Sequence, residues 1–200
     1  MLVNCVAYQD GKKLADIDKH EISNYVSRPD CFVWVALKVP DDAELADMQE
    51  EFGLHPLAVE DARHGHQRPK IEEYGDMVFT VLHVVEPMGD DLRIGEVAVF
   101  VGPNYVLSVR IHAEKGFQEV RARCEREPDL LRHGSGYVLY ALMDSVVDRY
   151  FRLPDALESE LEQIEQRIFS PQTSATANLQ ALYSVKQRVM ILKHAPAPLL

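Results

Sequence analysis

The sequence predicts an α/β (α+β) protein, in which a mixed sheet is flanked by helices on both faces and is followed by a long antiparallel helical hairpin. Runs of β-branched and aromatic residues alternate with short helical segments over residues 1–112. Helical periodicity then dominates from residue 115 to 194, and a turn over residues 171–177 divides it into two arms. We therefore predict an αβα domain over residues 1–132 and a helical hairpin over residues 133–200.

Six segments have the composition of β-strands. Residues 31–37 (CFVWVAL) are apolar throughout, which is typical of a central strand that is buried on both faces. Gly102-Pro103-Asn104 has the residues of a tight turn and joins the last two strands into a hairpin. The predicted strands are residues 2–8, 31–37, 71–74, 77–85, 95–101 and 105–111.

Three short helices are predicted between these strands. Two of them begin with a capping box, in which an aspartate and a glutamate three residues later each bond the backbone N–H of the other. The pairs are Asp18 with Glu21, for a helix to about residue 26, and Asp41 with Glu44, for a helix over residues 42–52. Gly53 can end the second helix in the left-handed conformation, and Pro56 suits the first turn of a third helix that continues to about residue 63.

The remaining helices form the C-terminal part. We predict a helix over residues 114–127, a short helix from Pro128 to residue 132, and a long helix that starts after the turn Gly134-Ser135-Gly136. Pro154 predicts a kink or break of the long helix near Arg152. Apolar residues three or four apart predict that the two arms of the hairpin pack along one seam. They are Leu153, Leu157, Leu161, Ile164 and Ile168 in the first arm and Leu179, Leu182, Val185, Val189 and Leu192 in the second.

The charge and hydropathy of the chain exclude several classes of function. The chain has 21 Lys and Arg against 32 Asp and Glu, a net charge of -11, and no basic run, so we expect no nucleic-acid partner. The longest apolar run is far shorter than the roughly 20 residues that cross a bilayer. The N-terminus has no secretory signal and the three cysteines are widely spaced, which is typical of a cytoplasmic protein with reduced thiols.

No familiar catalytic motif is present, and we predict that the chain is not an enzyme. Glu60 and His64 lie four residues apart on one predicted helix face, with His66 close behind, and this trio could ligate zinc or another transition metal. A soluble metal-dependent hydrolase is therefore one alternative, although hydrogen bonding of His64 at the helix end is the favoured interpretation. A soluble scaffold whose hairpin binds another helix is a second alternative.

Acidic residues in two places could attract hard divalent cations, which prefer carboxylate oxygens and retain water. Asp90 and Asp91 lie in a loop between two predicted strands. A second group lies on the long helix and consists of Asp155, Glu158, Glu160, Glu162 and Glu165. Single or paired carboxylates hold a hydrated Mg²⁺ without enclosing it, so we expect weak binding at both places.

Several linked segments carry a family resemblance. They are residues 52–61 (FGLHPLAVED), 66–74 (HQRPKIEEY), 81–83 (VLH), 96–109 (EVAVFVGPNYVLSV) and 139–151 (LYALMDSVVDRYF). Together they closely resemble the cytoplasmic domain of the CorA family of divalent metal-ion transporters. Residues 157–169 and 179–192 are similar to the acidic helical hairpin that lies beside the stalk of that family.

The resemblance implies an ion-sensing, regulatory domain on the cytoplasmic side of the cell inner membrane. Members of the family move Mg²⁺, and often Co²⁺ or Ni²⁺, through a homopentameric pore, and Mg²⁺ held between neighbouring cytoplasmic domains stabilises the closed state. A zinc (Zn²⁺) transporter of the same superfamily is an alternative, although the context of Arg68-Pro69-Lys70 is more similar to CorA. The family's stalk and two membrane helices are absent from these 200 residues, so we expect the soluble part of a longer subunit.

The resemblance also implies a location for the sensing site. One of the family's sensing carboxylates lies in the loop before the strand that matches residues 95–101, and its partner comes from the stalk. Asp90 and Asp91 occupy that loop here, so we expect them to form half of a metal site. Arg68 and Lys70 are cationic and cannot ligate a divalent cation, so we expect their segment to be structural.

Overall fold

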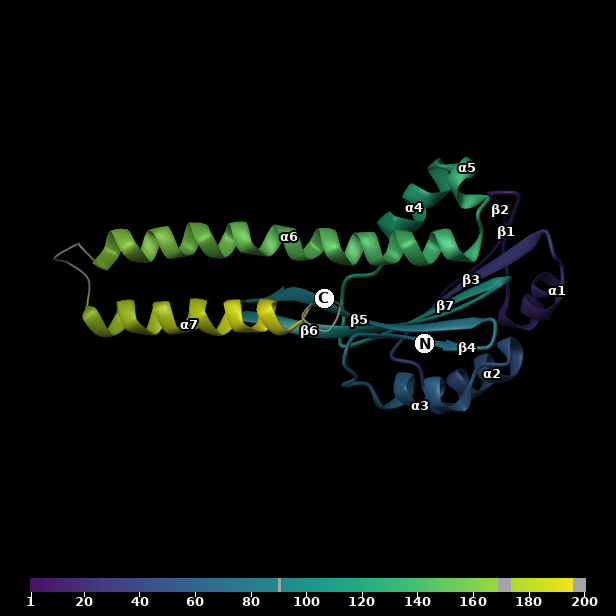
Figure 1. The fold of residues 1–200 in the computed structure, drawn as a ribbon, viewed down its shortest axis with the longest axis horizontal. Helices are drawn as coiled ribbons and strands as arrows, with labels where there is room; N and C mark the ends of the chain where they lie inside the picture. Colours follow the sequence, from purple (N-terminus) through teal and green to yellow (C-terminus); the bar gives the residue numbers. More distant parts are fainter. Residues whose placement is uncertain (90, 169–173, 196–200) are drawn as a thin grey trace.

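The computed structural model describes residues 1–89, 91–168 and 174–195, and these residues form a seven-stranded sheet from which two long helices extend (Figure 1). The strands are β1 (Leu2–Gln9), β2 (Lys12–Asp16), β3 (Cys31–Lys38), β4 (Lys70–Tyr74), β5 (Met77–Met88), β6 (Asp91–Gly102) and β7 (Tyr105–Ile111). Their order is β2-β1-β3-β7-β6-β5-β4, and only β3 and β7 are parallel. The predicted mixed sheet is confirmed.

Both faces of the sheet are apolar because successive side chains along a strand point to opposite sides. In β3, Val33 and Val35 are buried in the core on one face, whereas Phe32 and Trp34 are buried in the core on the other. The apolar run that predicted a central strand therefore does belong to a strand that is covered on both faces.

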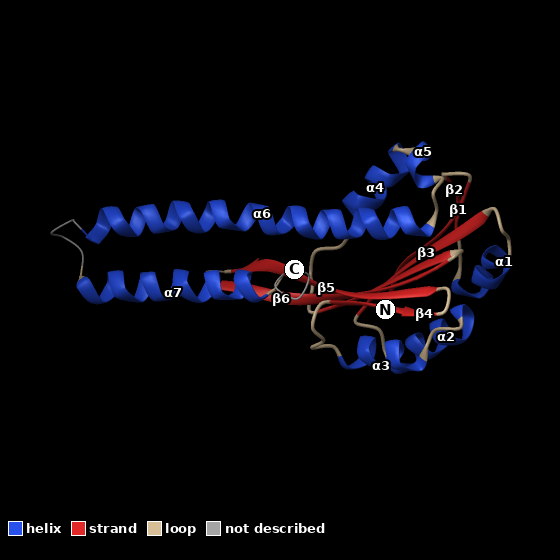
Figure 2. Cartoon of the chain, viewed as in Figure 1, coloured by secondary structure: helices blue, strands red, loops and turns tan. Residues whose placement is uncertain are grey.

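Three helices cover the first face of the sheet: α1 (Ile22–Val26), α2 (Asp42–Phe52) and α3 (Pro56–His64) (Figure 2). Both predicted capping boxes are present, and the one at Asp18 opens a short 3-10 helix, η1 (Lys19–Glu21), that leads into α1. Gly53 ends α2 with a φ of 63°, a conformation that glycine adopts at little cost. The local signals at these helix ends are therefore confirmed.

Helices α4 (Gln118–Arg126), α5 (Pro128–Leu131) and the first part of α6 (Ser135–Ile168) cover the second face. Val138, Leu142 and Val146 of α6 are buried in the same core as Trp34. The first arm of the hairpin therefore begins as part of the core on the second face of the sheet.

The predicted antiparallel hairpin is formed by α6 and α7 (Ala175–His194), which lie side by side in Figure 1. A kink or break was predicted near Arg152, and the break is wrong, because α6 is one continuous helix of 34 residues with Pro154 inside it. Proline removes one backbone hydrogen bond from a helix and crowds the preceding turn. In α6 the sheet holds the part before Pro154 and α7 holds the part after it, and this packing keeps the helix continuous.

Three other boundaries differ from the predictions. Strand β2 was not predicted because it is a mostly exposed edge strand and lacks the apolar alternation that marks a buried one. β5 and β6 extend further than expected and form a ribbon in which Pro87 lies opposite Leu92. Helix α4 begins at Gln118 rather than at residue 114, because the carboxylate of Glu86 binds the backbone before it.

The middle of β6 approaches the chain after β7 very closely. A Cβ atom built on Gly95 would lie 2.7 Å from the Cβ of Ala113 and 2.9 Å from its backbone N. Such distances are too short for any side chain, so the strand needs glycine at this position.

Candidate metal site at the tip of the sheet

Asp91 lies at the tip of the β5–β6 ribbon, where it pairs with Met88 in the sheet register. Its side chain is exposed, and its Oδ1 accepts a hydrogen bond of 2.8 Å from the N–H of Leu92. Asp90, the other predicted ligand, lies outside the described residues. The structure therefore places one of the two predicted carboxylates.

The ribbon tip lies against α7. Asp91 and residues of α7, among them Tyr183 and Lys186, line a shallow depression of about 410 Å³. An ammonium group in the same depression competes with a cation for the carboxylate. Within the described residues, no group of three or more His, Cys, Asp or Glu side chains is placed to hold a metal ion. Asp91 by itself can attract a hydrated cation but cannot enclose it.

The trio that motivated the hydrolase alternative is not assembled into a metal site. The Nδ1 of His64 lies 2.9 Å from the carbonyl oxygen of Glu60, so the ring bonds the backbone of its own helix. The backbone N–H of His66 donates to the carboxylate of Glu96, and its ring lies against His112 with 5.8 Å between centroids. These contacts agree with the favoured interpretation of His64 as a helix-end residue.

Lys70 has a structural role, as predicted. Its Nζ lies 2.7 Å from the Oδ2 of Asp61 and 2.8 Å from the Oε2 of Glu72, so it joins α3 to β4. Burial lowers the pKa of this ammonium group, but the two carboxylates outweigh burial and the pKa is raised. The same contact with Lys70 lowers the pKa of Glu72.

Glu86 is a buried carboxylate that sequence reasoning missed. It is 4% exposed and accepts two backbone hydrogen bonds of 2.8 Å each, from Glu114 and Lys115. Arg93 lies 3.4 Å away and supplies a positive charge. Glu86 therefore fixes the segment that connects β7 to α4, and no local pattern marks it because its partners are 28 and 29 residues away.

Helix α6 is anchored to the sheet by polar contacts as well as by its apolar face. The hydroxyl of Tyr150 donates to the carbonyl oxygen of His83 on β5 at 2.5 Å. Burial raises the pKa of Tyr150 to about 12, so the hydroxyl keeps its proton at neutral pH. Arg149 donates to the carbonyl oxygen of Gly116 at 2.8 Å and lies over the ring of Phe117.

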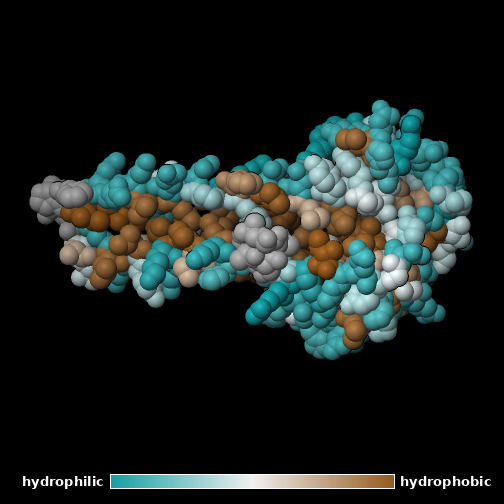
Figure 3. Space-filling model, viewed as in Figure 1, coloured by the Kyte–Doolittle hydropathy of each residue, from teal (hydrophilic) through white to brown (hydrophobic). Residues whose placement is uncertain are grey.

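The hairpin buries only part of its predicted apolar seam. Leu157, Ile164 and Val185 are buried. Five other seam residues are exposed by 36% to 68%: Leu161, Ile168, Leu179, Leu182 and Val189. Figure 3 shows apolar residues along both arms on the viewed face. The expectation that all ten residues share one seam is therefore wrong, because two helices provide a single contact surface and a wider apolar stripe stays outside it.

The acidic face of α6 is mostly solvated. Glu160 forms an ion pair of 2.6 Å with Arg188 of α7, whereas Glu158 and Glu162 are exposed one turn apart. One acid of this group therefore joins the two arms of the hairpin, and the exposed pair is left to attract hydrated cations.

Comparison with known proteins identifies relatives of the chain. The family of CorA-like Mg²⁺ transporter proteins matches residues 30–199. YfjQ of Bacillus subtilis, whose name assigns it to metal ion transport, is 37% identical over 142 residues, which cover 70% of this chain and 44% of that protein. The cobalt/magnesium transport protein CorA of Thermotoga maritima is 30% identical over 153 residues, which cover 75% of this chain and 43% of that protein.

Solved structures have the same fold. The full-length CmaX protein superposes with a TM-score of 0.78 at 17% identity, over 98% of this chain and 60% of that one. The soluble domain of CorA from Methanocaldococcus jannaschii superposes with a TM-score of 0.68 at 17% identity, over 98% of this chain and 76% of that one. The chain spans less than half the length of the two relatives above. None of its described helices combines the length and apolar character needed to cross a bilayer.

Proposed function

Because the chain belongs to the family of CorA-like Mg²⁺ transporter proteins, we propose that it forms the ion-sensing, regulatory part of a divalent-cation transporter. The family match over residues 30–199 carries this proposal. Mg²⁺ is the proposed transported and regulatory ion, and Co²⁺, Ni²⁺ and Zn²⁺ are the other candidates. In this proposal the chain itself performs no catalysis.

We place the chain on the cytoplasmic side of the inner membrane, as part of a homopentamer. The membrane-crossing helices belong to the remainder of the subunit in this proposal. Residues 1–132 act as the sensing domain, and residues 133–200 form the hairpin that lies beside the stalk. The exposed apolar residues of the hairpin, such as Leu179 and Leu182, support this arrangement because they offer a surface on which another helix can pack.

Electrostatic repulsion between subunits supplies the regulatory free energy in this proposal. Each chain has a net charge of -11, so assembly into a ring brings like charges together. Divalent cations bound between subunits offset this repulsion, and their loss loosens the ring. Asp90 and Asp91 supply one half of the site at the ribbon tip, and a carboxylate from a neighbouring stalk supplies the other half.

A flux measurement on the full-length transporter tests the proposal. The whole protein is placed in vesicles, and Mg²⁺ entry is followed with a fluorescent indicator while Mg²⁺ on the cytoplasmic face is varied. We expect entry to slow as that concentration reaches about millimolar, the range of sites with few carboxylates. The double variant Asp90→Asn with Asp91→Asn should need a several-fold higher Mg²⁺ concentration on the cytoplasmic face for the same slowing of entry. The exposed control Glu50→Gln should behave as the wild type does.

The outcomes separate the parts of the proposal. If no divalent cation enters the vesicles, the chain is not part of a transporter. Coincident inhibition curves for the double variant and the wild type would remove the sensing role from Asp90 and Asp91. Parallel measurements with Co²⁺, Ni²⁺ and Zn²⁺ identify the transported ion.

A further inference from the structure

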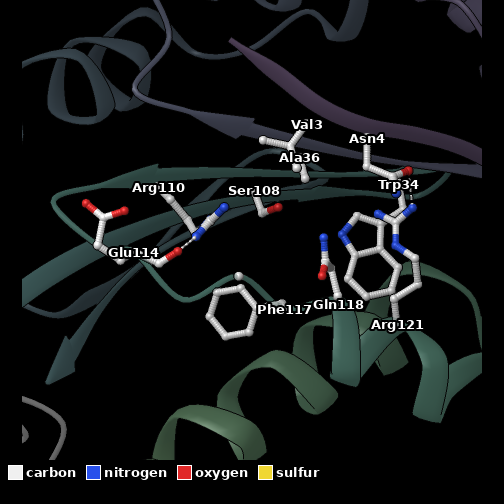
Figure 4. A pocket seen from close by; sticks show the side chains of 11 residues that line it. Val3, Asn4, Trp34, Ala36, Ser108, Arg110, Glu114, Phe117, Gln118 and Arg121 are labelled. Carbon is white, nitrogen blue, oxygen red and sulfur yellow. Dashed lines mark hydrogen bonds between the residues drawn. The ribbon is translucent and has the colours of Figure 1, made fainter. Parts of the chain in front are cut away.

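A cavity of about 220 Å³ lies between the second face of the sheet and the start of α4. Its polar lining comes from β1, β3, β7, α4 and the segment between β7 and α4, and Figure 4 shows these side chains around one space. The polar residues that matter here are Trp34, Ser108, Arg110, Gln118 and Arg121. The cavity is separate from the ribbon tip that carries Asp91.

Trp34 brings an unused hydrogen-bond donor to this cavity. Its side chain is 2% exposed, and its Nε1 is buried without a hydrogen-bond partner. Figure 4 shows the indole nitrogen on the edge of the ring that faces Gln118 and the interior of the cavity. A buried N–H group without an acceptor is costly, so this donor indicates an acceptor that the protein itself does not supply.

Two arginines place positive charge around the same space. Arg110 is 8% exposed, and its Nη1 donates to the carbonyl oxygens of Ala113 and Glu114, which leaves other N–H groups of the guanidinium for the cavity. Arg121 lies over the ring of Trp34, 4.5 Å from its centroid, and donates to the side chain of Asn4.

Neither arginine has a carboxylate in direct contact among the described residues, although Glu86 and Glu114 attract Arg110, and Glu125 attracts Arg121, from a greater distance. Glu114 is the acidic residue of the lining, and its carboxylate is 2.7 Å from Lys38 and 3.7 Å from Arg93. The lining therefore carries two guanidinium groups against one carboxylate, in a chain whose net charge is -11.

The start of α4 adds further donors. Phe117 and Gln118 line the cavity, and the N-terminus of this nine-residue helix has no side-chain cap. The first N–H groups of a helix have no partner within the helix and favour an anion. The uncapped start of α4 therefore favours an anion, as do the two arginines and the free indole N–H.

We propose that this cavity binds a small oxyanion of the size of inorganic phosphate. The guanidinium groups, the indole N–H and the side-chain amide of Gln118 would donate to the several acceptor atoms of a tetrahedral oxyanion, whereas the hydroxyl of Ser108 already donates to the carbonyl oxygen of Val35. Pockets for larger organic ligands usually measure about 300–1,000 Å³, so the cavity suits the free ion rather than a whole nucleotide. The bound ion would bridge β3, β7 and α4. This inference does not rest on the proposed function.

Trp34 makes the proposal directly measurable because it is the chain's single tryptophan. Inorganic phosphate is titrated into the full chain at constant ionic strength, with NaCl as the balancing salt, and the emission of Trp34 is recorded. We expect a saturable change with phosphate and none with chloride. The variants Arg121→Lys and Gln118→Ala weaken the apparent affinity about tenfold and about threefold. Arg63→Lys, an exposed control on the other face of the sheet, leaves it unchanged.

Each outcome bears on the proposal. Gln118 is exposed, so Gln118→Ala keeps the fold testable even if Arg121→Lys unfolds, and the thermal midpoint of each variant is measured alongside. An absence of saturable change with phosphate would overturn the proposal, as would equal affinity in the wild type and Gln118→Ala. A response to ATP without a response to phosphate would overturn the assignment to a small ion.

Discussion

Replacement of Glu86 tests whether one buried carboxylate holds the connection between β7 and α4. The carboxylate accepts two hydrogen bonds of 2.8 Å from Glu114 and Lys115. A hydrogen bond to a charged group contributes about 1.5–3 kcal/mol, and the lower value applies here because both donor residues are exposed enough for water to replace the acceptor. Glu86→Ala should therefore lower the free energy of unfolding by about 3 kcal/mol.

Glu86→Gln separates charge from geometry. Glutamine keeps the side-chain volume and one acceptor oxygen, so we expect a loss of about 1.5 kcal/mol, half of the loss in Glu86→Ala. Arg93 adds little to either value because it is 31% exposed and its closest nitrogen is 3.4 Å from the carboxylate.

Urea unfolding at pH 7 measures both variants. With a slope of about 2 kcal/mol per molar urea, Glu86→Ala should lower the midpoint by about 1.5 M. The exposed control Glu50→Ala should change the free energy by less than about 0.5 kcal/mol. Amide hydrogen exchange should accelerate at Glu114 and Lys115 in both Glu86 variants. The reasoning is refuted if Glu86→Ala costs no more than the control, or if the glutamine and alanine variants are equally unstable.

Two further predictions concern packing and pH. Gly95→Ala should lower the free energy of unfolding by about 3 kcal/mol, because the new methyl group meets Ala113 at 2.7 Å. The control Gly136→Ala has open space around it and should cause no loss. Urea unfolding midpoints compare the two variants, and equal midpoints would contradict the close approach of Gly95 to Ala113. The Lys70 contact lowers the pKa of Glu72 from its ordinary value of 4.5, so its stabilisation is present above pH 4.5 and is lost as the pH falls through the lowered pKa. The stability difference between wild type and Lys70→Met should therefore shrink below pH 4.5 in urea titrations, and a difference that grows there would contradict this assignment.

Much of the fold could be predicted because its signals are local. The capping boxes at Asp18 and Asp41 and the left-handed Gly53 each depend on a few neighbouring residues, and the structure contains all three. β2 was not predicted because an exposed edge strand buries neither face and so lacks the alternating apolar and polar pattern of a half-buried strand. The break predicted at Pro154 does not occur, because the free-energy cost of proline inside a helix is smaller than the stabilisation from packing α6 on the sheet and on α7.

The sites were harder to predict than the fold. Asp91 was predicted as a metal ligand from a family resemblance and from its loop position, but its neighbour Lys186 could not be predicted because it is distant in the sequence. The anion cavity combines Trp34, Arg110 and Arg121, which lie on two strands and a helix and form no motif. Trp34 in particular has the sequence context of an ordinary core residue. The parallel pairing of β3 with β7 brings Trp34 and Arg110 together, and the packing of α4 adds Arg121.

The continuity of α6 makes the hairpin a lever. Its inner part is fixed to the sheet as far as the hydrogen bond between Tyr150 and His83, and the helix continues to Ile168. At 1.5 Å per residue this outer segment is about 27 Å long, so a tilt of about 10° at Tyr150 moves its far end by about 5 Å. That sideways displacement is about half the roughly 10 Å diameter of a helix with its side chains. A small rearrangement at the sheet can therefore move the outer end of the hairpin by about half a helix width.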